Sequence, residues 1–257
     1  MNARRFLRLG LYCVAVLMLL YAGRGLLSYY READASVDVT QDLLEMAVTP
    51  IEPAEYPATE EEPAMEYAPF TVDFETLKTE GRDIVAWLYC DDTPINYPIV
   101  QGDDNEFYVE HLPDGTWNGF GTIFLDFINE PDFTDFNSIL FGHNMLDDSM
   151  FGTVTEYNDQ AYYEAHPVMY LMTPGQYYKV ELVGGVILPM NSWFYDLDYL
   201  AAHKREAFVQ QLREKSTFVT AADFGVEDRF LTLSTCTYEF ENARYLLVGK
   251  LVPVAGA

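Results

Sequence analysis

From Thr71 onward the chain is a succession of short apolar and β-branched segments separated by turn residues. This pattern limits the possible folds more than any other feature. Pairs such as Asp114-Gly115, Asn118-Gly119 and Pro174-Gly175 mark the turns. Many short strands at this spacing favour a β-barrel or a β-sandwich. The expected strands are Ile84–Leu88, Tyr97–Val100, Gly121–Leu125, Ser138–Phe141, Val168–Met172, Tyr177–Leu188, Phe230–Ser234 and Arg244–Val252.

A helix is expected to interrupt the strands between Ala201 and Ser216. Phe208 and Leu212 lie four residues apart there, among Lys and Arg side chains, which is the pattern of a surface helix packing one face on a core. Shorter helices are expected at Phe74–Glu80 and Met150–Glu156. The sequence therefore predicts a mainly β fold with a few helices.

The N-terminus is apolar and basic. Leu9–Gly23 holds 15 uncharged, mostly apolar residues between Arg8 and Arg24. As a helix it is about 22 Å long, so it spans a bilayer core of about 30 Å only if its flanks join in and the arginines snorkel. An uncleaved anchor and a cleavable signal peptide both fit. We favour the anchor, because Ala22-Gly23-Arg24 is not a small-x-small cleavage site.

The charge distribution indicates which side of the membrane each part occupies. Residues 1–31 hold five Arg and no acid, whereas the rest of the chain carries 10 basic and 41 acidic residues. Basic residues before an apolar segment favour a cytoplasmic N-terminus. We therefore expect a single-pass membrane protein whose folded domain lies outside the cell. So acidic a domain is not expected to bind nucleic acid.

The next segment, Glu32–Phe70, has 11 acidic residues, five prolines and no basic residue. Such a segment buries too little apolar surface to offset its ordering entropy. We expect a spacer there, with one possible short helix at Val39–Val48. The expected division is an anchor at 1–31, a spacer at 32–70 and a folded domain at 71–257.

Three residues together provide a thiol nucleophile, an imidazole that can act as acid and base, and a guanidinium that can stabilise an oxyanion. Cys236 ends the run Thr232-Leu233-Ser234-Thr235-Cys236, and Arg244 lies on the next expected strand, so the two could face one another in a hairpin. His143 follows an apolar strand and a Gly. An imidazole makes the thiolate accessible and can protonate a leaving amine, while a guanidinium can stabilise an oxyanion. Each residue alone also has a structural interpretation.

The other candidates are weaker. Cys13 lies in the apolar N-terminal run and Cys90 beside an expected strand, so no disulfide framework is expected and Cys90 is interpreted as a core residue. The remaining histidines are interpreted as structural or exposed. Acidic pairs such as Asp91-Asp92 lack the ligand spacing of a calcium loop, and neither a metal nor a cofactor is expected.

Taken together, the motifs resemble the sortase family, and class B sortases most closely. The resemblance extends from about Phe74 to Val252. It implies an eight-stranded β-barrel with N-terminal helices and one helix inserted between late strands. It rests on Thr232–Cys236 with Arg244 downstream, Phe141-Gly142-His143-Asn144-Met145, Asp91–Gln101, Asp104-Asn105 with Tyr108, and Gly121–Asp126.

The resemblance also implies a reaction. Cys236 would attack the carbonyl of a threonine in a C-terminal sorting motif of a secreted protein, forming a thioacyl-enzyme. His143 would protonate the leaving amine and then deprotonate an amine of a cell-wall precursor or pilin, in a Gram-positive-type envelope. Arg244 would bind the substrate and the tetrahedral intermediate. By position, four residues match the family's peptide groove: Asn105, Val109, Phe141 and Ser234.

Two other functions remain open at this point. A cysteine peptidase would use the same nucleophile but give the acyl group to water. A non-catalytic surface module would keep the barrel for binding alone, although it would have no need of a free thiol outside the cell.

Overall fold

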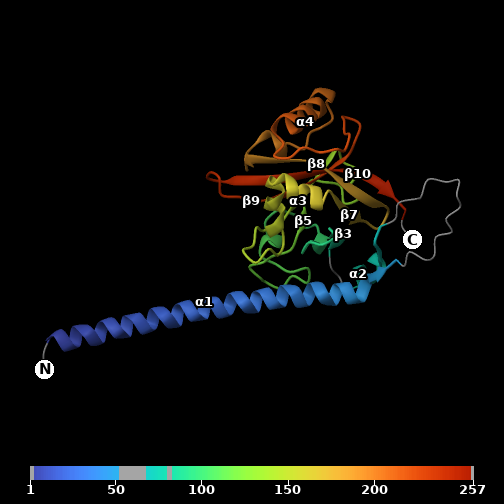
Figure 1. Ribbon diagram of the computed structural model, residues 1–257. Coiled ribbons are helices and arrows are strands. Elements are labelled where there is room, and N and C mark those ends of the chain that lie inside the picture. The colour runs from blue at the N-terminus through green and yellow to red at the C-terminus, as the bar shows by residue number, and fades with distance from the viewer. Residues whose placement is uncertain (1–2, 52–67, 80–82, 256–257) are drawn as a thin grey trace.

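The computed structural model describes residues 3–51, 68–79 and 83–255, and strands β3 to β10 close into a barrel (Figure 1). The predicted eight-stranded barrel is thus confirmed. Its order is β10-β8-β7-β3-β4-β5-β6-β9, in which β4–β5 and β6–β9 are parallel pairs. The strands are β3 (Ile84–Tyr89), β4 (Asn96–Val100), β5 (Phe124–Leu125), β6 (Asn137–Phe141), β7 (Val168–Met172), β8 (Tyr177–Pro189), β9 (Phe230–Cys236) and β10 (Ala243–Val254).

Helices and a small second sheet lie outside the barrel. Strands β1 (Val48–Pro50) and β2 (Phe70–Val72) pair antiparallel. The helix α4 (Ala202–Lys215) follows the prediction to within one residue at each end, and it packs on β8 and buries Phe208 and Leu212 in one cluster with residues of β8, β9 and β10. The other helices are α1 (Ala3–Ala47), α2 (Phe74–Thr79), α3 (Gln160–Ala165) and the 3-10 helices η2 (Phe107–Val109), η3 (Gly152–Asn158) and η4 (Trp193–Tyr195).

Two predicted elements differ from the structure. The strand expected at Gly121–Leu125 is reduced to β5, because Gly121 has a left-handed φ of 59° and the Thr122 N–H donates to the Tyr108 carbonyl, off the sheet. The helix expected at Met150–Glu156 is the 3-10 helix η3, shifted two residues along the chain.

The helix α1 crosses the boundary expected at residue 31 and runs on to Ala47. Val39, Leu43 and Ala47 recur every four residues on one face, and this face packs with α2 and β3. Leu43 is fully buried, which contributes about 2 kcal/mol. Residues 32–50 are thus helix and strand docked on the barrel rather than a loose spacer. The short helix expected at Val39–Val48 lies mostly within α1, and residues 52–67 fall outside the described residues.

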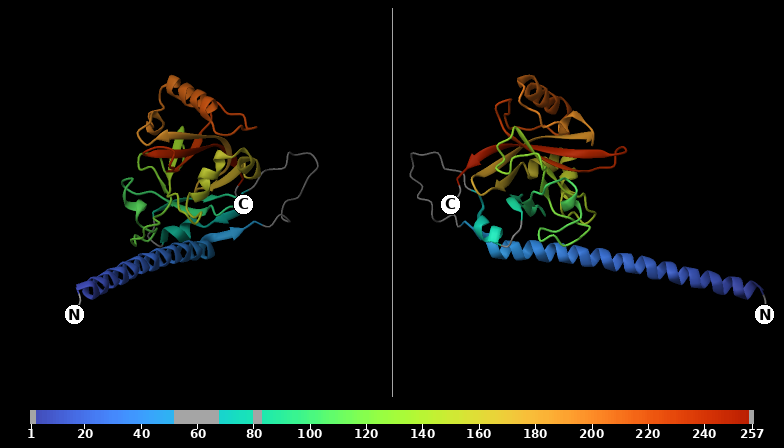
Figure 2. Two further views of the ribbon diagram at one scale, coloured as in Figure 1. Left: turned by 60° about the vertical axis from the view of Figure 1, so that its left-hand side comes forward. Right: turned by 180° about the vertical axis from the view of Figure 1, so that it is seen from behind.

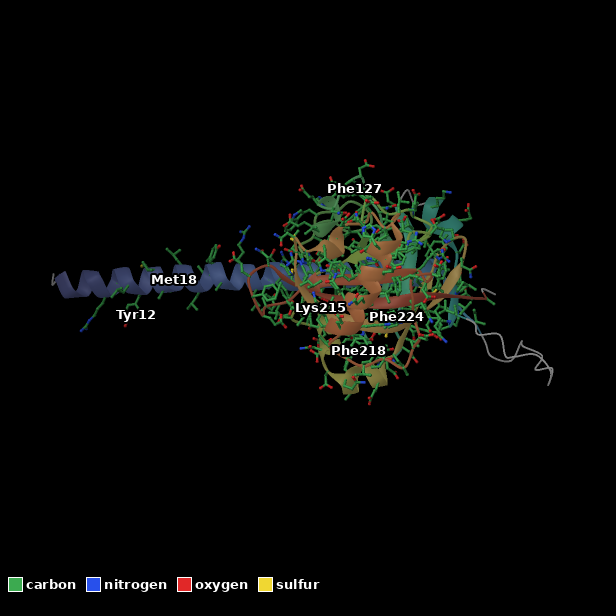
Figure 3. All side chains as sticks on the ribbon, turned by 90° about the horizontal axis from the view of Figure 1, so that it is seen from above. Tyr12, Met18, Phe127, Lys215, Phe218 and Phe224 are labelled. Carbon is green, nitrogen blue, oxygen red and sulfur yellow. The ribbon has the colours of Figure 1, made fainter. Side chains whose placement is uncertain are left out.

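The N-terminal half of α1 extends away from the barrel (Figures 1 and 2). Tyr12 and Met18 lie on this projecting part (Figure 3). In the part of the chain that the structure describes, α1 is the one helix long and apolar enough to cross a membrane, and its apolar stretch is not buried. The β9–β10 hairpin points to the same side as the N-terminal end of α1 (Figures 1 and 2).

Candidate active site

The β9–β10 hairpin brings a thiol and a guanidinium together. Cys236 and Arg244 are direct partners in the register of this antiparallel pair, as the sequence predicted. The connection is compact, since the Thr237 N–H donates to the Ala243 carbonyl at 3.1 Å and Asn242 turns the chain with a left-handed φ of 60°. Asn tolerates that conformation better than most residues. The hairpin therefore fixes both groups on one short ladder.

His143 reaches the same end of the barrel through the parallel pairing of β6 with β9. Phe141 is the register partner of Ser234. Beyond the ladder, the Gly142 N–H donates to the Ser234 carbonyl at 3.2 Å, and Thr235 Oγ1 donates to the Gly142 carbonyl at 2.8 Å. His143 follows at once, so the two strand ends bring the imidazole to the Cys236 end of β9.

The surroundings of His143 indicate which ring nitrogen donates a hydrogen bond. Its Nε2 lies 2.9 Å from the Val109 carbonyl. Because a carbonyl only accepts hydrogen bonds, Nε2 is the donor in this contact, and Nδ1 takes no part in it. On the other side, Asn144 Nδ2 donates to the Cys236 carbonyl at 2.8 Å, which ties the loop after His143 to the nucleophile's backbone.

All seven predicted site residues line one groove of about 420 Å³. Its walls come from β5, β6, β9, β10, the loop around η2 and the connection after β8, and they are more apolar than polar. Phe141 lies between two rings, 5.3 Å from Phe124 and stacked at 6.2 Å on Tyr195. The lining residues are Asn105, Val109, Thr122, Phe124, Asp126, Phe141, Gly142, His143, Met190, Tyr195, Ser234, Thr235, Cys236 and Arg244. A groove of this kind suits an extended peptide.

The polar side chains of the groove are held in place by neighbours. Asn105 Nδ2 donates to Asp126 Oδ2 at 3.0 Å, while Asn105 Oδ1 accepts from the Phe127 N–H at 3.0 Å. At the other wall, Ser234 Oγ and the Tyr195 hydroxyl lie 2.8 Å apart. Both amide and hydroxyl groups are therefore oriented in advance, which limits the entropy lost on binding a peptide.

Tyr195 is one of the groove residues that sequence reasoning missed. It belongs to η4, in the connection between β8 and α4, where Met190 also reaches the groove. The only signal is the aromatic run Trp193-Phe194-Tyr195, which equally fits a packed core. Burial raises the pKa of Tyr195, so its hydroxyl stays neutral at neutral pH.

Arg244 presents a positive charge at the groove. Its Nη1 donates to the Ala243 carbonyl at 3.0 Å and its Nη2 lies 3.3 Å from Met190 Sδ. Neither partner carries a negative charge, and among the described residues no carboxylate lies within ion-pair distance of this guanidinium. The charge therefore remains available for an oxyanion or a peptide carbonyl.

The other thiols lie elsewhere. Cys90 is buried in the barrel core, 3.6 Å from the Tyr157 hydroxyl, and burial raises its pKa. Cys13 is on the projecting half of α1. Within the described residues, no group of three or more His, Cys, Asp or Glu side chains is arranged to hold a metal ion. The chemistry that this arrangement allows is attack by the Cys236 thiolate on a carbonyl.

A Gly142→Ala substitution tests how closely the His143 loop is packed. A Cβ at residue 142 would lie 2.6 Å from the ring of Phe151, which is fully buried. We expect a loss of about 1–3 kcal/mol in the free energy of unfolding, measured by urea denaturation. Gly175→Ala is the control, because nothing lies within 4 Å of its Cβ position. Equal stability of the two variants would contradict the packing argument.

Comparison with known proteins identifies relatives of one kind. Sortase B of Listeria monocytogenes is 33% identical over 178 residues, covering 68% of this chain and 72% of the relative. Sortase B of Staphylococcus aureus is 29% identical over 184 residues, covering 71% and 75%. No protein-family profile matches the sequence.

Solved structures agree with the sequence comparison. The crystal structure of Staphylococcus aureus sortase B has a TM-score of 0.67 at 28% identity, covering 71% of this chain and 87% of that one. A sortase B structure from Bacillus anthracis has a TM-score of 0.72 at 27% identity, covering 87% and 99%. The likeness thus includes the whole barrel.

Proposed function

Because this chain belongs to the class B sortases, and is a cysteine transpeptidase of that family, we propose that Cys236 captures a threonine of a C-terminal sorting motif. The Cys236 sulfur forms a thioester with the threonine carbonyl carbon, and the peptide C–N bond after the threonine breaks. The motif's downstream part leaves as an amine. The substrate is then a secreted protein that carries the motif near its C-terminus.

His143 is the proposed acid and base. Its imidazolium gives a proton to the leaving amine, which needs to depart neutral. It then takes a proton from the incoming amine of a cell-wall precursor or a pilin, while that nitrogen forms the new amide bond and the Cys236 thiolate leaves. Nδ1 is the nitrogen that exchanges this proton, since Nε2 is held by the Val109 carbonyl.

Arg244 is proposed to stabilise the tetrahedral intermediates of both steps. It faces Cys236 across the hairpin ladder, so a carbonyl attacked by the thiolate would develop its negative charge beside the guanidinium. The single observation that carries this function is the convergence of Cys236, His143 and Arg244 in one groove. Asn105, Val109, Phe141 and Ser234 are proposed to contact the sorting peptide.

The proposed location is the outer face of the cell membrane. The projecting, apolar half of α1 supports a single-pass anchor, and the arginines before it support a cytoplasmic N-terminus. The folded domain is then extracellular, where both a secreted substrate and an envelope amine are present.

Transpeptidation and hydrolysis are separated by the need for an amine. The full chain in detergent micelles is incubated with a library of sorting-type peptides, with and without an acceptor, and its products are followed by mass spectrometry. Triglycine is one acceptor, since a related sortase B has been crystallised in complex with that peptide, and a lysine peptide is another. We expect an amide product that requires the amine. Free acid formed at the same rate without it would support the peptidase instead, and no acyl-enzyme at all would support the binding module.

A further inference from the structure

The docked half of α1 is bonded to the loop at residues 118–120. Asn118 Nδ2 donates to the Glu32 backbone carbonyl at 2.8 Å, and the Gly119 N–H donates to the Glu32 carboxylate at 3.2 Å. Phe120 is buried and packs on the ring of Tyr29, with centroids 5.3 Å apart. Polar and aromatic contacts thus fix this loop to the helix.

The same loop is built onto the segment that carries Val109. The Asn118 N–H donates to the Glu110 carbonyl and the Thr122 N–H to the Tyr108 carbonyl, both at 2.9 Å. Between them, Gly121 approaches so closely that a Cβ there would collide with the Val109 carbonyl. Movement of residues 118–122 would therefore displace the backbone around Val109.

Val109 in turn holds the catalytic imidazole. Its carbonyl accepts the hydrogen bond from His143 Nε2 at 2.9 Å. A second contact comes from the loop after His143, where the Asp147 carboxylate faces the Tyr29 hydroxyl; burial, and after it this carboxylate, raises the pKa of that tyrosine. The helix α1 therefore reaches His143 from two directions, through residues 118–122 and through Asp147.

We propose that Glu32 is a positioning residue for His143. Its carboxylate and its carbonyl hold the loop at residues 118–122, and this loop holds the Val109 carbonyl that orients the imidazole. Glu32 itself does not line the groove, so it acts only through these contacts. The inference rests on the proposed function, because that function gives His143 its role. Misplacing a catalytic group by about 1 Å can cost up to about 100-fold in rate.

The test compares three variants of the full chain in detergent micelles. Glu32→Ala removes the carboxylate, Glu32→Gln keeps an acceptor oxygen, and Asp34→Ala is the control, an exposed acid on the same helix. We expect Glu32→Ala to lower kcat about tenfold while KM for the sorting peptide changes by less than about twofold. Glu32→Gln should recover most of the lost rate, and Asp34→Ala should behave like the parent.

Alkylation of Cys236 by iodoacetamide gives a readout that needs no turnover. Because a displaced imidazole supports the thiolate less well, Glu32→Ala should slow it by about threefold. If the parent alkylates but makes no amide product, the proposed function fails while the positioning by Glu32 is still measured. Parental kcat and parental alkylation in Glu32→Ala would overturn the proposal, as would an equal loss in Asp34→Ala.

A shortened side chain provides a second variant if Glu32→Ala unfolds below the assay temperature. Glu32→Asp keeps the charge and the helix but withdraws the carboxylate by one methylene from the Gly119 N–H. A loss of about threefold in kcat with unchanged KM supports the positioning role. Parental kcat in this variant overturns it.

Discussion

Replacing Cys236 with alanine is expected to lower transpeptidation at least about 10⁴-fold, because no other group in the groove can form the thioester. The fold should persist, since Cys236 is only half-buried at the end of β9 and a small side chain replaces it. Mass spectrometry of the enzyme after incubation with peptide should show the acyl adduct in the parent and not in the variant.

The control for this variant is Cys90→Ala. Cys90 is buried away from the groove, so its loss should lower the free energy of unfolding by about 1 kcal/mol and leave the acyl adduct intact. An adduct that persists in Cys236→Ala would place the nucleophile elsewhere. An adduct lost only in Cys90→Ala would contradict the assignment of both thiols.

Replacing Arg244 with alanine is expected to lower kcat about 10²- to 10³-fold without unfolding the barrel. The guanidinium faces Cys236 across the ladder, and within the described residues its hydrogen-bond partners are a carbonyl and a thioether, so under the proposed mechanism its charge would stabilise the developing oxyanion. Steady-state kinetics with a sorting peptide measures the effect, and thermal melting by circular dichroism checks the fold.

Two further variants sharpen the test of Arg244. Arg244→Lys keeps the charge but loses the fork of donors, and it should recover only part of the rate. Lys215→Ala removes a cation at the exposed end of α4, outside the groove, and should leave kcat unchanged. Near-normal turnover in Arg244→Ala would remove this residue from the mechanism.

The sequence predicts the β9–β10 hairpin well because all of its determinants are local. Arg244 lies eight residues after Cys236, and two β-type runs flank the turn, so the register pair follows from a compact connection. The position of His143 is harder, since it depends on the parallel pairing of β6 with β9, which no local pattern encodes. The prediction that His143 lies beside Cys236 came instead from the resemblance of Phe141–Met145 to the sortase motif.

Tyr195 and the docked part of α1 show what the sequence alone does not encode. Tyr195 reaches the groove because the long connection after β8 folds back, and its aromatic neighbours give no sign of direction. The acidic composition of residues 32–47 favours a solvated spacer, whereas the four-residue spacing of Val39, Leu43 and Ala47 favours a packed helix. The sequence interpretation followed the composition, and the structure shows the helix. The partners of that face, Leu77 and Trp87, lie far along the chain, so its burial is a tertiary effect.

If α1 is the membrane anchor that we propose, its unbroken course also sets the orientation of the barrel relative to the bilayer. Tyr29, the first residue seen docked, lies only six residues after Gly23, the end of the apolar run, which is about 9 Å of helix. With α1 anchored as proposed, the continuous helix would leave no flexible linker between the membrane and the barrel. The β9–β10 hairpin, on the side of the N-terminal end of α1, would then point toward the lipid. Cys236 would then lie close to the membrane surface. It would reach sorting motifs of secreted proteins whose C-terminal tails are still held in the membrane.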